Sequence, residues 1–308
     1  MRNSLTIGTR GSQLALWQSQ FIKDQLERHF SGIEVHLKVI KTTGDTIQNR
    51  SLVGLGKGVF TKEIENALLT GDIDLAVHSL KDLPTELPAG LYIAAIPARE
   101  DPRDVLITST GLPLESLPKR AKIGTTSPRR KAQLLYIHPD VQVVDVRGNV
   151  DTRLRKLHET DLDGIILAAA GIKRLLKPEI ITQFFDTEEM VPAVGQGALA
   201  IETRERDSRV EKLIAPLNDH HAAAEITAER AVLESLGGGC QVPIGAYAKH
   251  VNGELSLVGA VCHPKGSVRI VERATGTPGT AKHLGAVVAE KLRNSGATEL
   301  LKVQESDK

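Results

Sequence analysis

Hydrophobic and polar positions follow one repeating order along most of the chain. A short apolar run comes first, then a polar loop, and then a segment in which apolar residues recur at spacings of three and four. The first such unit is "SLTIGT", followed by a helix in which Leu14, Trp17 and Phe21 share a face and Ser12 is placed as the N-cap. This alternation predicts a mostly parallel sheet that is covered by helices.

The same order begins again in the middle of the chain. The segment "KIGTTSPRRKAQLLYI", from Lys122, resembles "TIGTRGSQLALWQ", from Thr6, since both have Ile-Gly-Thr, a polar loop with Arg and Ser, and a helix. The repeat predicts two related α/β domains. Segments 97–104 and 191–204 are predicted to cross between them and to form a hinge beside a ligand-binding cleft.

The last third of the chain has a different pattern. A helix that begins near His220 runs into three glycines, and three alternating segments follow, with the hairpin signal Asn252-Gly253 between the first two. One final helix, over about 280–296, is predicted to close the chain. The pattern indicates a small α+β domain with a three-stranded antiparallel sheet. We place domain 1 at 1–98 and 197–217, domain 2 at 99–196, and domain 3 at 218–308.

Composition narrows the classes of function. The chain has 308 residues, of which 41% are hydrophobic and 25% charged, and its formal net charge is +1. This balance gives no bulk field for nucleic acid or an anionic membrane. Aromatic residues make up 3%, which disfavours the stacking platforms of single-strand nucleic-acid binders. With two cysteines, no long apolar N-terminal run and no metal-ligand motif, we expect a cytoplasmic protein without a bound metal.

Polar and cationic residues gather in the loops where predicted strands end, which is where open α/β sheets bind ligands. These residues are Arg10, Ser12, Ser79, Lys81, Asp82, Thr125, Thr126, Ser127, Arg129, Arg130, Arg147, Arg153, Lys173 and Arg174. Guanidinium groups bind carboxylate or phosphate, and helix N-termini add backbone donors. The set predicts a cleft for a polyanionic small ligand, whereas each arginine alone is equally well explained as a solvated residue at a helix start.

Three further residues are candidates for the chemistry. Asp82, in "AVHSLKDLP", is placed to stabilise a developing cation, or it only pairs with Lys81. Cys240 follows three glycines, which leave room for a bulky group against the backbone, but an idle loop cysteine explains it better on composition alone. Lys57 lies in a glycine-rich segment that lacks P-loop spacing and is as well explained as a lid.

The chain resembles the porphobilinogen deaminases, also called hydroxymethylbilane synthases. The motifs that carry the resemblance run in order: "IGTRGSQLALWQ", "DLAVHSLKDLP", "REDPRD", "GTTSPRR", "VRGNVDTR", "PAVGQGALAIE" and "GGGCQVPIGAY". The resemblance implies two periplasmic-binding-protein-like domains joined by a double-crossing hinge, plus the C-terminal α+β domain. It also implies a monomeric transferase of tetrapyrrole (haem and porphyrin) biosynthesis, which joins four porphobilinogen molecules head to tail into linear hydroxymethylbilane.

The resemblance also implies roles for individual residues. Cys240 carries a dipyrromethane cofactor through a thioether, and Asp82 is the catalytic aspartate that stabilises positive charge on each pyrrole. The cofactor-binding residues are Lys81, Ser79, Thr125, Ser127, Arg129, Arg130 and Arg147. The substrate-binding residues are Arg10, Ser12, Arg153, Arg174, Gln196 and Thr126, and Lys57 belongs to the lid. Val53 and Pro128 depart from the lysine and leucine that family members often have there.

The competing hypothesis is a non-enzymatic anion-binding or ligand-sensing protein on the same two-domain scaffold. Fold alone would permit it. Such a protein should carry an export signal or a DNA-binding domain, and we expect neither here. It would also have no need of both Asp82 and Cys240.

Overall fold

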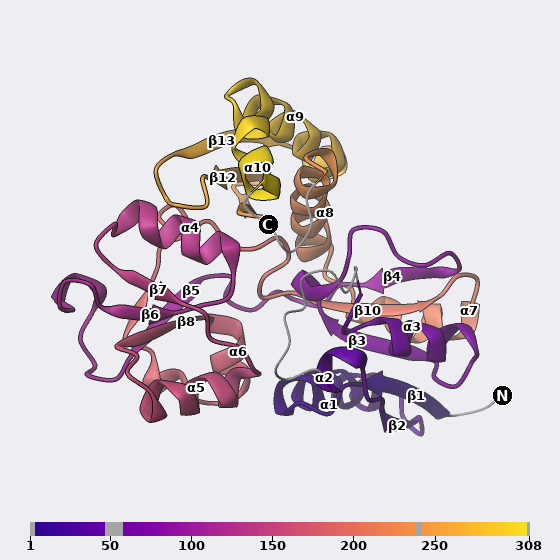
Figure 1. Cartoon of the computed structure of the whole chain (residues 1–308). Helices are drawn as coiled ribbons and strands as arrows, with labels where there is room; N and C mark the ends of the chain where they lie inside the picture. The colour runs from indigo at the N-terminus through magenta and orange to yellow at the C-terminus, as the bar shows by residue number, and fades with distance from the viewer. Residues whose placement is uncertain (1–3, 47–57, 238–241, 307–308) are drawn as a thin grey trace. The chain divides into compact units, whose positions relative to one another are not determined.

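The computed structural model describes residues 4–46, 58–237 and 242–306 (Figure 1). The chain forms two compact units: unit 1 is Met1–Arg99 with Ala198–Ala223, and unit 2 is Glu100–Gly197 with Ala224–Lys308. The predicted domain bounds, which separate residues 218–308 as a third domain, stay a prediction. Within the described residues, no helix has both the length and the apolar character that a membrane crossing requires.

Unit 1 is built on a five-stranded sheet with the order β2-β1-β3-β10-β4. Its strands are β1 (Ser4–Thr9), β2 (Glu34–Val39), β3 (Leu75–Ser79), β4 (Leu91–Ala95) and β10 (Leu199–Arg204). Its helical segments are α1 (Gln13–His29), α2 (Thr43–Thr46), α3 (Lys62–Leu69), η1 (Leu80–Asp82), α7 (Ser208–Ile214) and η4 (Ala215–Leu217). Strand β10 runs antiparallel to both of its neighbours, whereas β1 is parallel to β2 and β3. The predicted mostly parallel sheet is confirmed, with one inverted strand.

Unit 2 contains a second five-stranded sheet with the order β7-β6-β8-β5-β9. Its strands are β5 (Asp104–Thr108), β6 (Lys122–Gly124), β7 (Gln142–Val144), β8 (Gly164–Ala168) and β9 (Gln183–Phe184). Its helical segments are η2 (Leu114–Ser116), α4 (Pro128–Ile137), α5 (Val150–Glu159), α6 (Ala169–Arg174) and η3 (Pro178–Ile180). The two sheets correspond strand by strand: β6 matches β1, β7 matches β2, β8 matches β3, β5 matches β10 and β9 matches β4. Strand β5, like β10, is antiparallel to both of its neighbours. This repeat confirms the prediction of two related α/β domains.

The inverted strand of each sheet begins at the carboxyl edge of the parallel strands. Leu199 of β10 pairs with Ser79 at the end of β3, and Asp104 of β5 pairs with Ala168 at the end of β8. Both crossing segments therefore arrive where ligands bind in open α/β sheets. Gly197 lies on the second segment with φ +89°, and a Cβ there would stand 2.2 Å from the Glu100 carbonyl oxygen, so only glycine fits.

The first helix differs in one respect from its prediction. Ser12 is the N-cap of α1, since its side chain accepts a hydrogen bond from Ala15 N, as expected. The face expected to be buried, which carries Trp17 and Phe21, is only half-buried, and these two rings stack at 5.4 Å. The buried face is instead that of Gln18, Ser19, Ile22 and Leu26, one residue further round the helix. Gln18 is thereby brought under the sheet.

The C-terminal part of unit 2 is an antiparallel sheet packed against helices. Its elements are β11 (Ile244–Val251), β12 (Glu254–Cys262), β13 (Arg269–Gly276), α8 (His220–Ser235), η5 (Pro278–Thr280), α9 (Ala281–Asn294) and α10 (Ala297–Ser306). The predicted three-stranded sheet and hairpin are confirmed, with φ +51° at Asn252 and +86° at Gly253. The prediction of one final helix was wrong, because Gly296, at φ +95°, ends the first helix and a second one follows.

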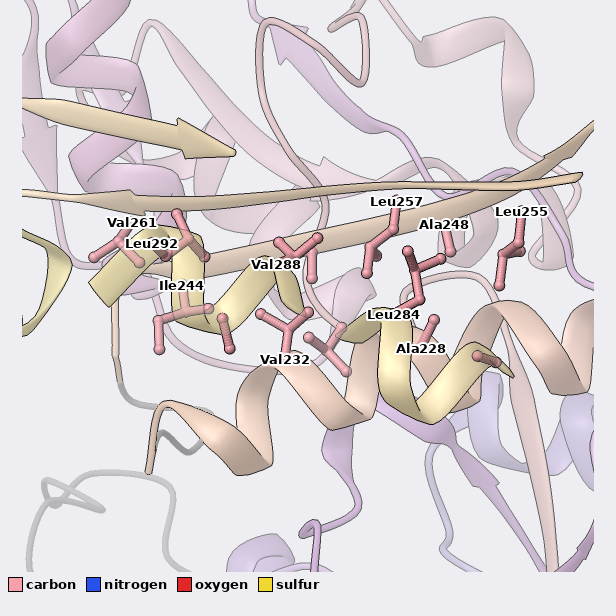
Figure 2. Packing of buried hydrophobic residues seen from close by; sticks show 14 of the residues in the cluster. Ala228, Val232, Ile244, Ala248, Leu255, Leu257, Val261, Leu284, Val288 and Leu292 are labelled. Atoms are coloured by element: carbon pink, nitrogen blue, oxygen red, sulfur yellow. The ribbon is translucent and has the colours of Figure 1, made fainter. Parts of the chain in front are cut away.

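Helices α8 and α9 cover one face of this sheet (Figure 2). Val232 of α8 and Val288 of α9 are fully buried against Leu257 of β12. Burying one such side chain contributes about 1.5–3 kcal/mol. The two helices come close at Gly285, where a Cβ would stand 2.3 Å from the Ala228 carbonyl oxygen of α8.

We predict that Gly285→Ala destabilises this part of the protein. Overpacking costs about 1–3 kcal/mol and the better helix propensity of alanine recovers up to about 1, so the free energy of unfolding should fall by about 1–2 kcal/mol in urea denaturation. Gly279→Ala is the control, since a Cβ at Gly279 meets no atom within 4 Å. An unchanged or higher stability of Gly285→Ala would contradict the close packing of α8 and α9.

Candidate functional site

The carboxyl end of β3 carries three of the predicted site residues. Ser79 is the last residue of this strand, and Lys81 and Asp82 follow in the single turn η1. Asp82 is exposed and Lys81 is half-buried. Gln18 of α1, which is 2% exposed, donates a hydrogen bond from Nε2 to Ser79 Oγ at 2.8 Å. This bond occupies an acceptor site of the hydroxyl and leaves its proton available for donation to a ligand.

A buried hydrogen bond between side chains links β3 to β10. His78 Nε2 lies 3.0 Å from Glu202 Oε2, and both side chains are almost wholly buried. Glu65 of α3 is 6% exposed, and burial, with the Glu202 carboxylate as a smaller cause, raises the pKa of its carboxyl group. The His78–Glu202 bond ties together the two central strands just before the turn that presents Asp82.

Arg10 is held by an acidic partner in unit 1. Its Nη2 atom lies 2.5 Å from Asp45 Oδ1, and its guanidinium carbon lies 4.2 Å from the centroid of the Phe60 ring. Thr42 Oγ1 also donates to Asp45 Oδ2 at 2.8 Å. Burial raises the pKa of Asp45, but the bonds from Arg10 and Thr42 outweigh it and hold the pKa below its usual value. A ligand carboxylate that binds Arg10 here has to compete with Asp45.

Unit 2 contains a buried cluster around Asp104, the first residue of β5. Arg129 Nη1 donates to Asp104 Oδ2 at 2.7 Å, and Arg130 Nε donates to Asp104 Oδ1 at 2.8 Å. Gln196 Nε2 donates to the same Oδ1 at 3.0 Å. Asp104 and Gln196 are fully buried, and the arginines are 3% and 5% exposed. The cluster joins β5, α4 and the second crossing segment.

Asp104 is the shared carboxylate of two buried arginines. Burial alone would raise the pKa of Asp104, but the two guanidinium groups hold it far below its usual value, so the carboxylate stays ionised. Two guanidinium groups thus face one carboxylate. In addition, Arg129 Nε is buried and has no hydrogen-bond partner among the described residues. A buried N–H without an acceptor is costly, so this donor indicates a site for an anionic or carbonyl oxygen.

The loop between β6 and α4 presents hydroxyl groups beside this cluster. Ser127 caps α4, accepting from Arg130 N at 3.4 Å, and its own N–H donates to Thr125 Oγ1 at 3.2 Å. Thr125 is 1% exposed, whereas Thr126 and Ser127 are half-buried. The turn thus places short polar side chains at the N-terminus of a ten-residue helix, where anions are favoured.

Three further arginines of unit 2 follow other strands. Arg147 comes after β7, and Arg153 lies on α5, with its Nε donating to the Gly148 carbonyl oxygen at 2.8 Å; both are half-buried. Arg174, at the end of α6, is 7% exposed and donates from Nη2 to the Gly197 carbonyl oxygen at 2.7 Å. Burial lowers the pKa of Arg174 to about 10, and Glu100 offsets this only in part. Unit 2 therefore keeps a desolvated cation here as well.

The second crossing segment, which carries Gln196, is fastened to the C-terminal sheet. Glu229 of α8, which is fully buried, accepts from Gly195 N at 2.7 Å and from Ala248 N at 2.9 Å. The N–H of Ala246 donates to the Pro192 carbonyl oxygen at 3.0 Å. These contacts fix the backbone of the segment that leads into the site glutamine.

The predicted residues fall into three groups. Arg10, Ser12, Ser79, Lys81 and Asp82 lie in unit 1, and Thr125, Thr126, Ser127, Arg129, Arg130, Arg147, Arg153, Arg174 and Gln196 lie in unit 2. Lys57 and Cys240 lie outside the described residues. Among the described residues, no His, Cys, Asp and Glu side chains group as a metal site would require.

Sequence reasoning assigned no role to three residues that hold the candidate site together. Asp104 stood inside the motif "REDPRD", and an acidic residue at the start of an apolar strand was the available signal. Gln18 faces the sheet only because the buried face of α1 differs from the predicted one. Asp45 lies in a polar stretch whose contact with Arg10 no spacing rule reveals.

The architecture is that of a two-domain ligand-binding protein with an added α+β domain. It combines two α/β sheets of the same strand order with a C-terminal antiparallel sheet, and buried arginines lie at the carboxyl edge of one α/β sheet. Residues 5–212 match the family model "Porphobilinogen deaminase, dipyromethane cofactor binding domain", and residues 223–294 match "Porphobilinogen deaminase, C-terminal domain". The chain therefore belongs to the porphobilinogen deaminase family, which confirms the predicted resemblance and the predicted transferase.

Curated relatives match over nearly the whole chain. A porphobilinogen deaminase of Syntrophotalea carbinolica is 49% identical over 97% of this chain and 95% of its own length. That of Geobacter sulfurreducens is 47% identical over 97% of this chain and 94% of its own length. Among solved structures, the methionine-binding protein MetQ is similar with a TM-score of 0.45 and 12% identity, covering 70% of this chain and 90% of MetQ.

A second acidic cluster near the candidate site has a structural role. Asp101 Oδ1 accepts from Arg103 Nε at 2.9 Å, and its Oδ2 accepts from Lys173 Nζ at 2.8 Å. Burial would raise the pKa of Asp101, but these bonds hold it well below the ordinary value of 3.8. Within the described part of the chain, the hydrogen bonds of the Asp101 carboxylate go to Arg103 and Lys173 and not to Arg129 or Arg130.

We predict that Asp101→Asn lowers the free energy of unfolding at pH 7 by about 1–3 kcal/mol, because bonds to charged groups are lost. The wild-type carboxylate contributes this stability fully above 3.8, its ordinary pKa, and loses it as the pH falls toward the lower pKa of the folded state. Thermal melts from pH 7 to pH 3 should therefore show the wild-type advantage narrowing with acidity. An advantage that is constant with pH would exclude an ionised, paired Asp101.

Proposed function

We propose that the chain extends a dipyrromethane primer held as a thioether on Cys240, with Asp82 as catalytic carboxylate and the arginines of both units as carboxylate-binding residues. The observation that carries this proposal is the buried pair of guanidinium groups on Asp104 in unit 2, in which Arg129 Nε has no hydrogen-bond partner among the described residues. Each pyrrole of such a primer bears acetate and propionate side chains, so the anionic group and the donor set are complementary.

Family membership defines the overall reaction, which is the joining of porphobilinogen units into a linear tetrapyrrole. At each addition, the bond from the aminomethyl carbon to nitrogen breaks and ammonia leaves. A bond then forms between that carbon and the free α-carbon of the terminal pyrrole, which loses its proton. When bound, the primer supplies the first nucleophilic α-carbon, and water finally releases hydroxymethylbilane.

The chain's own residues have to stabilise charge and orient the rings. Asp82 is exposed on the turn that follows the buried strand β3, so its carboxylate is accessible to a substrate. There the carboxylate accepts a hydrogen bond from the pyrrole N–H and stabilises the positive charge that develops when ammonia leaves. Ser79, oriented by Gln18, donates a hydrogen bond from its hydroxyl group to the cofactor, and Lys81 adds positive charge for the cofactor carboxylates.

The residues of unit 2 would hold the carboxylates of the primer and of the growing chain. We assign Thr125, Ser127, Arg129, Arg130 and Arg147 to the primer. We assign Arg153, Arg174, Gln196 and Thr126 to the substrate units, with Arg10 and Ser12 from unit 1. Lys57 would act from a lid.

The cysteine assignment is supported by the environment of the other cysteine. Cys262 is fully buried in β12, and burial raises the pKa of its thiol to about 11. A thiol with so high a pKa is almost entirely protonated at neutral pH and is a poor nucleophile. Of the chain's two cysteines, Cys262 is thus the poorer candidate, which supports the assignment of the carrier role to Cys240 that the family resemblance implies.

We also propose that the protein works as a cytoplasmic monomer, with the three-domain division predicted from its sequence. The free, buried Cys262 is consistent with a reducing compartment. The competing hypothesis of a non-enzymatic anion binder is not favoured by the family match.

We predict that the purified protein is heavier than its sequence by two pyrrole units, all carried by Cys240. Intact mass spectrometry of Cys240→Ser should show the bare chain, and tetrapyrrole synthesis should be lost. Cys262→Ala is the matched control and should keep the added mass. An active, unmodified wild-type chain would refute the thioether.

We predict that Asp82→Asn keeps the primer and the melting temperature but lowers turnover by about 100-fold or more, as expected for the loss of a charge that stabilises a transition state. Glu86→Gln, an exposed carboxylate four residues along the chain, is the control and should retain wild-type turnover. Near-normal turnover of Asp82→Asn would remove Asp82 from the catalytic role.

A further inference from the structure

Asp104 is unusual among the acidic residues of unit 2, because each of its two oxygens is assigned to a different arginine. Oδ2 accepts from Arg129 and Oδ1 accepts from Arg130, and Gln196 adds a third bond. All three of these partners are proposed ligand-binding residues, whereas Asp104 itself is 0% exposed. Its carboxylate thus contacts the ligand-binding side chains but is itself too deeply buried to contact the ligand.

We infer that Asp104 is the positioning residue of the primer-binding site, which holds the Arg129 and Arg130 guanidinium groups in one fixed arrangement before the ligand arrives. This inference rests on the proposed function, since it presumes that the two arginines bind the carboxylates of the primer.

Each guanidinium group donates at least two hydrogen bonds. Arg129 Nη1 donates to Asp104 and also to the Val191 carbonyl oxygen at 2.8 Å. Arg130 donates from Nε to Asp104 and from Nη1 to the Ile166 carbonyl oxygen at 3.0 Å. These bonds leave from Nη1 alone in Arg129 and from Nε and Nη1 in Arg130, and they restrict the rotation of both planar groups. A free arginine side chain carries about 2 kcal/mol of rotamer entropy, and here the fold has already restricted it.

The backbone acceptors are themselves held in place. Gln133 of α4 donates from Nε2 to the Val191 carbonyl oxygen at 2.9 Å and accepts from Val191 N at 2.8 Å. Ile166 is in the middle of β8, next to β5. The arrangement therefore depends on the sheet, on α4 and on the second crossing segment together, and the Asp104 side chain bonds to both arginines.

A purely electrostatic role for Asp104 predicts the opposite outcome on mutation. If only net charge mattered, removing the carboxylate would leave two uncompensated cations and strengthen the binding of an anionic primer. If the position of the arginines matters, Asp104→Asn loosens the Arg129 and Arg130 guanidinium groups and weakens primer binding, although the site becomes more positive. The sign of the effect thus separates the two roles.

A purely structural role is separated by a matched variant. Asp101→Asn removes a second paired carboxylate three residues away, with bonds to Arg103 and Lys173 only among side-chain partners. It should lower stability without changing the primer site.

The experiment compares wild type, Asp104→Asn, Asp104→Glu and Asp101→Asn, each produced as the full chain. Intact mass spectrometry gives the fraction of folded chain that carries the primer, and steady-state kinetics of the loaded fraction gives KM and kcat for porphobilinogen. For Asp104→Asn we expect the loaded fraction to fall about tenfold and KM to rise about tenfold, with a smaller change in kcat. Asp104→Glu keeps the charge but displaces it, and should show the same changes to a lesser degree.

Several results would overturn the inference. Full loading with unchanged or lower KM in Asp104→Asn would leave only the electrostatic role, as would full recovery in Asp104→Glu. An equal loss of loading in Asp101→Asn, or failure of both Asp104 variants to fold, would make the role structural. A wild-type chain without primer mass would instead refute the proposed function.

Discussion

The buried contact of Asp104 with Arg129 and Arg130 is the interaction on which the rest of unit 2 depends. Taking two guanidinium groups out of water is expensive, and one carboxylate compensates for only part of the cost. Further hydrogen bonds offset part of the remaining cost, because Arg129 donates to the Val191 carbonyl oxygen and Arg130 donates to the Ile166 carbonyl oxygen. Arg129 Nε keeps a buried donor without an acceptor among the described residues, and an anionic ligand would be its natural complement. In the proposed function, a carboxylate of the bound pyrrole chain supplies that acceptor.

The position of this site follows from topology. In both units the inverted strand begins beside the carboxyl end of a central parallel strand, through the pairs Leu199–Ser79 and Asp104–Ala168. In each unit, one residue of the candidate site belongs to this strand pair. In unit 2 it is Asp104, the first residue of the inverted strand, and in unit 1 it is Ser79, the last residue of β3 before the turn with Asp82. Repetition of one architecture has given two carboxyl edges with different chemistry: an exposed carboxylate in one unit and buried arginines in the other.

The sequence predicted the elements well because their signals are local. Strand–helix alternation, the Ser12 cap and the Asn252-Gly253 hairpin depend on neighbouring residues, and the structure confirms all three. The motifs also named the arginines and Asp82. The sequence could not show that Asp104 binds two arginines, since these partners lie 25 and 26 residues away and meet only through the sheet. The buried face of α1 was not predicted because it depends on how the helix packs against the sheet. The break between the last two helices was not predicted because it depends on the backbone conformation of one residue, Gly296.

The account's central claim is that carboxylates of the bound pyrrole chain satisfy the cationic cluster organised by Asp104. The most direct test is the distance from Arg129 Nε to the nearest primer oxygen in a crystal structure of the loaded protein. We predict a hydrogen bond of about 2.7–3.2 Å, with both bonds from Asp104 to the arginines intact. A primer whose carboxylates bind elsewhere, with Arg129 Nε still lacking an acceptor, would contradict the account.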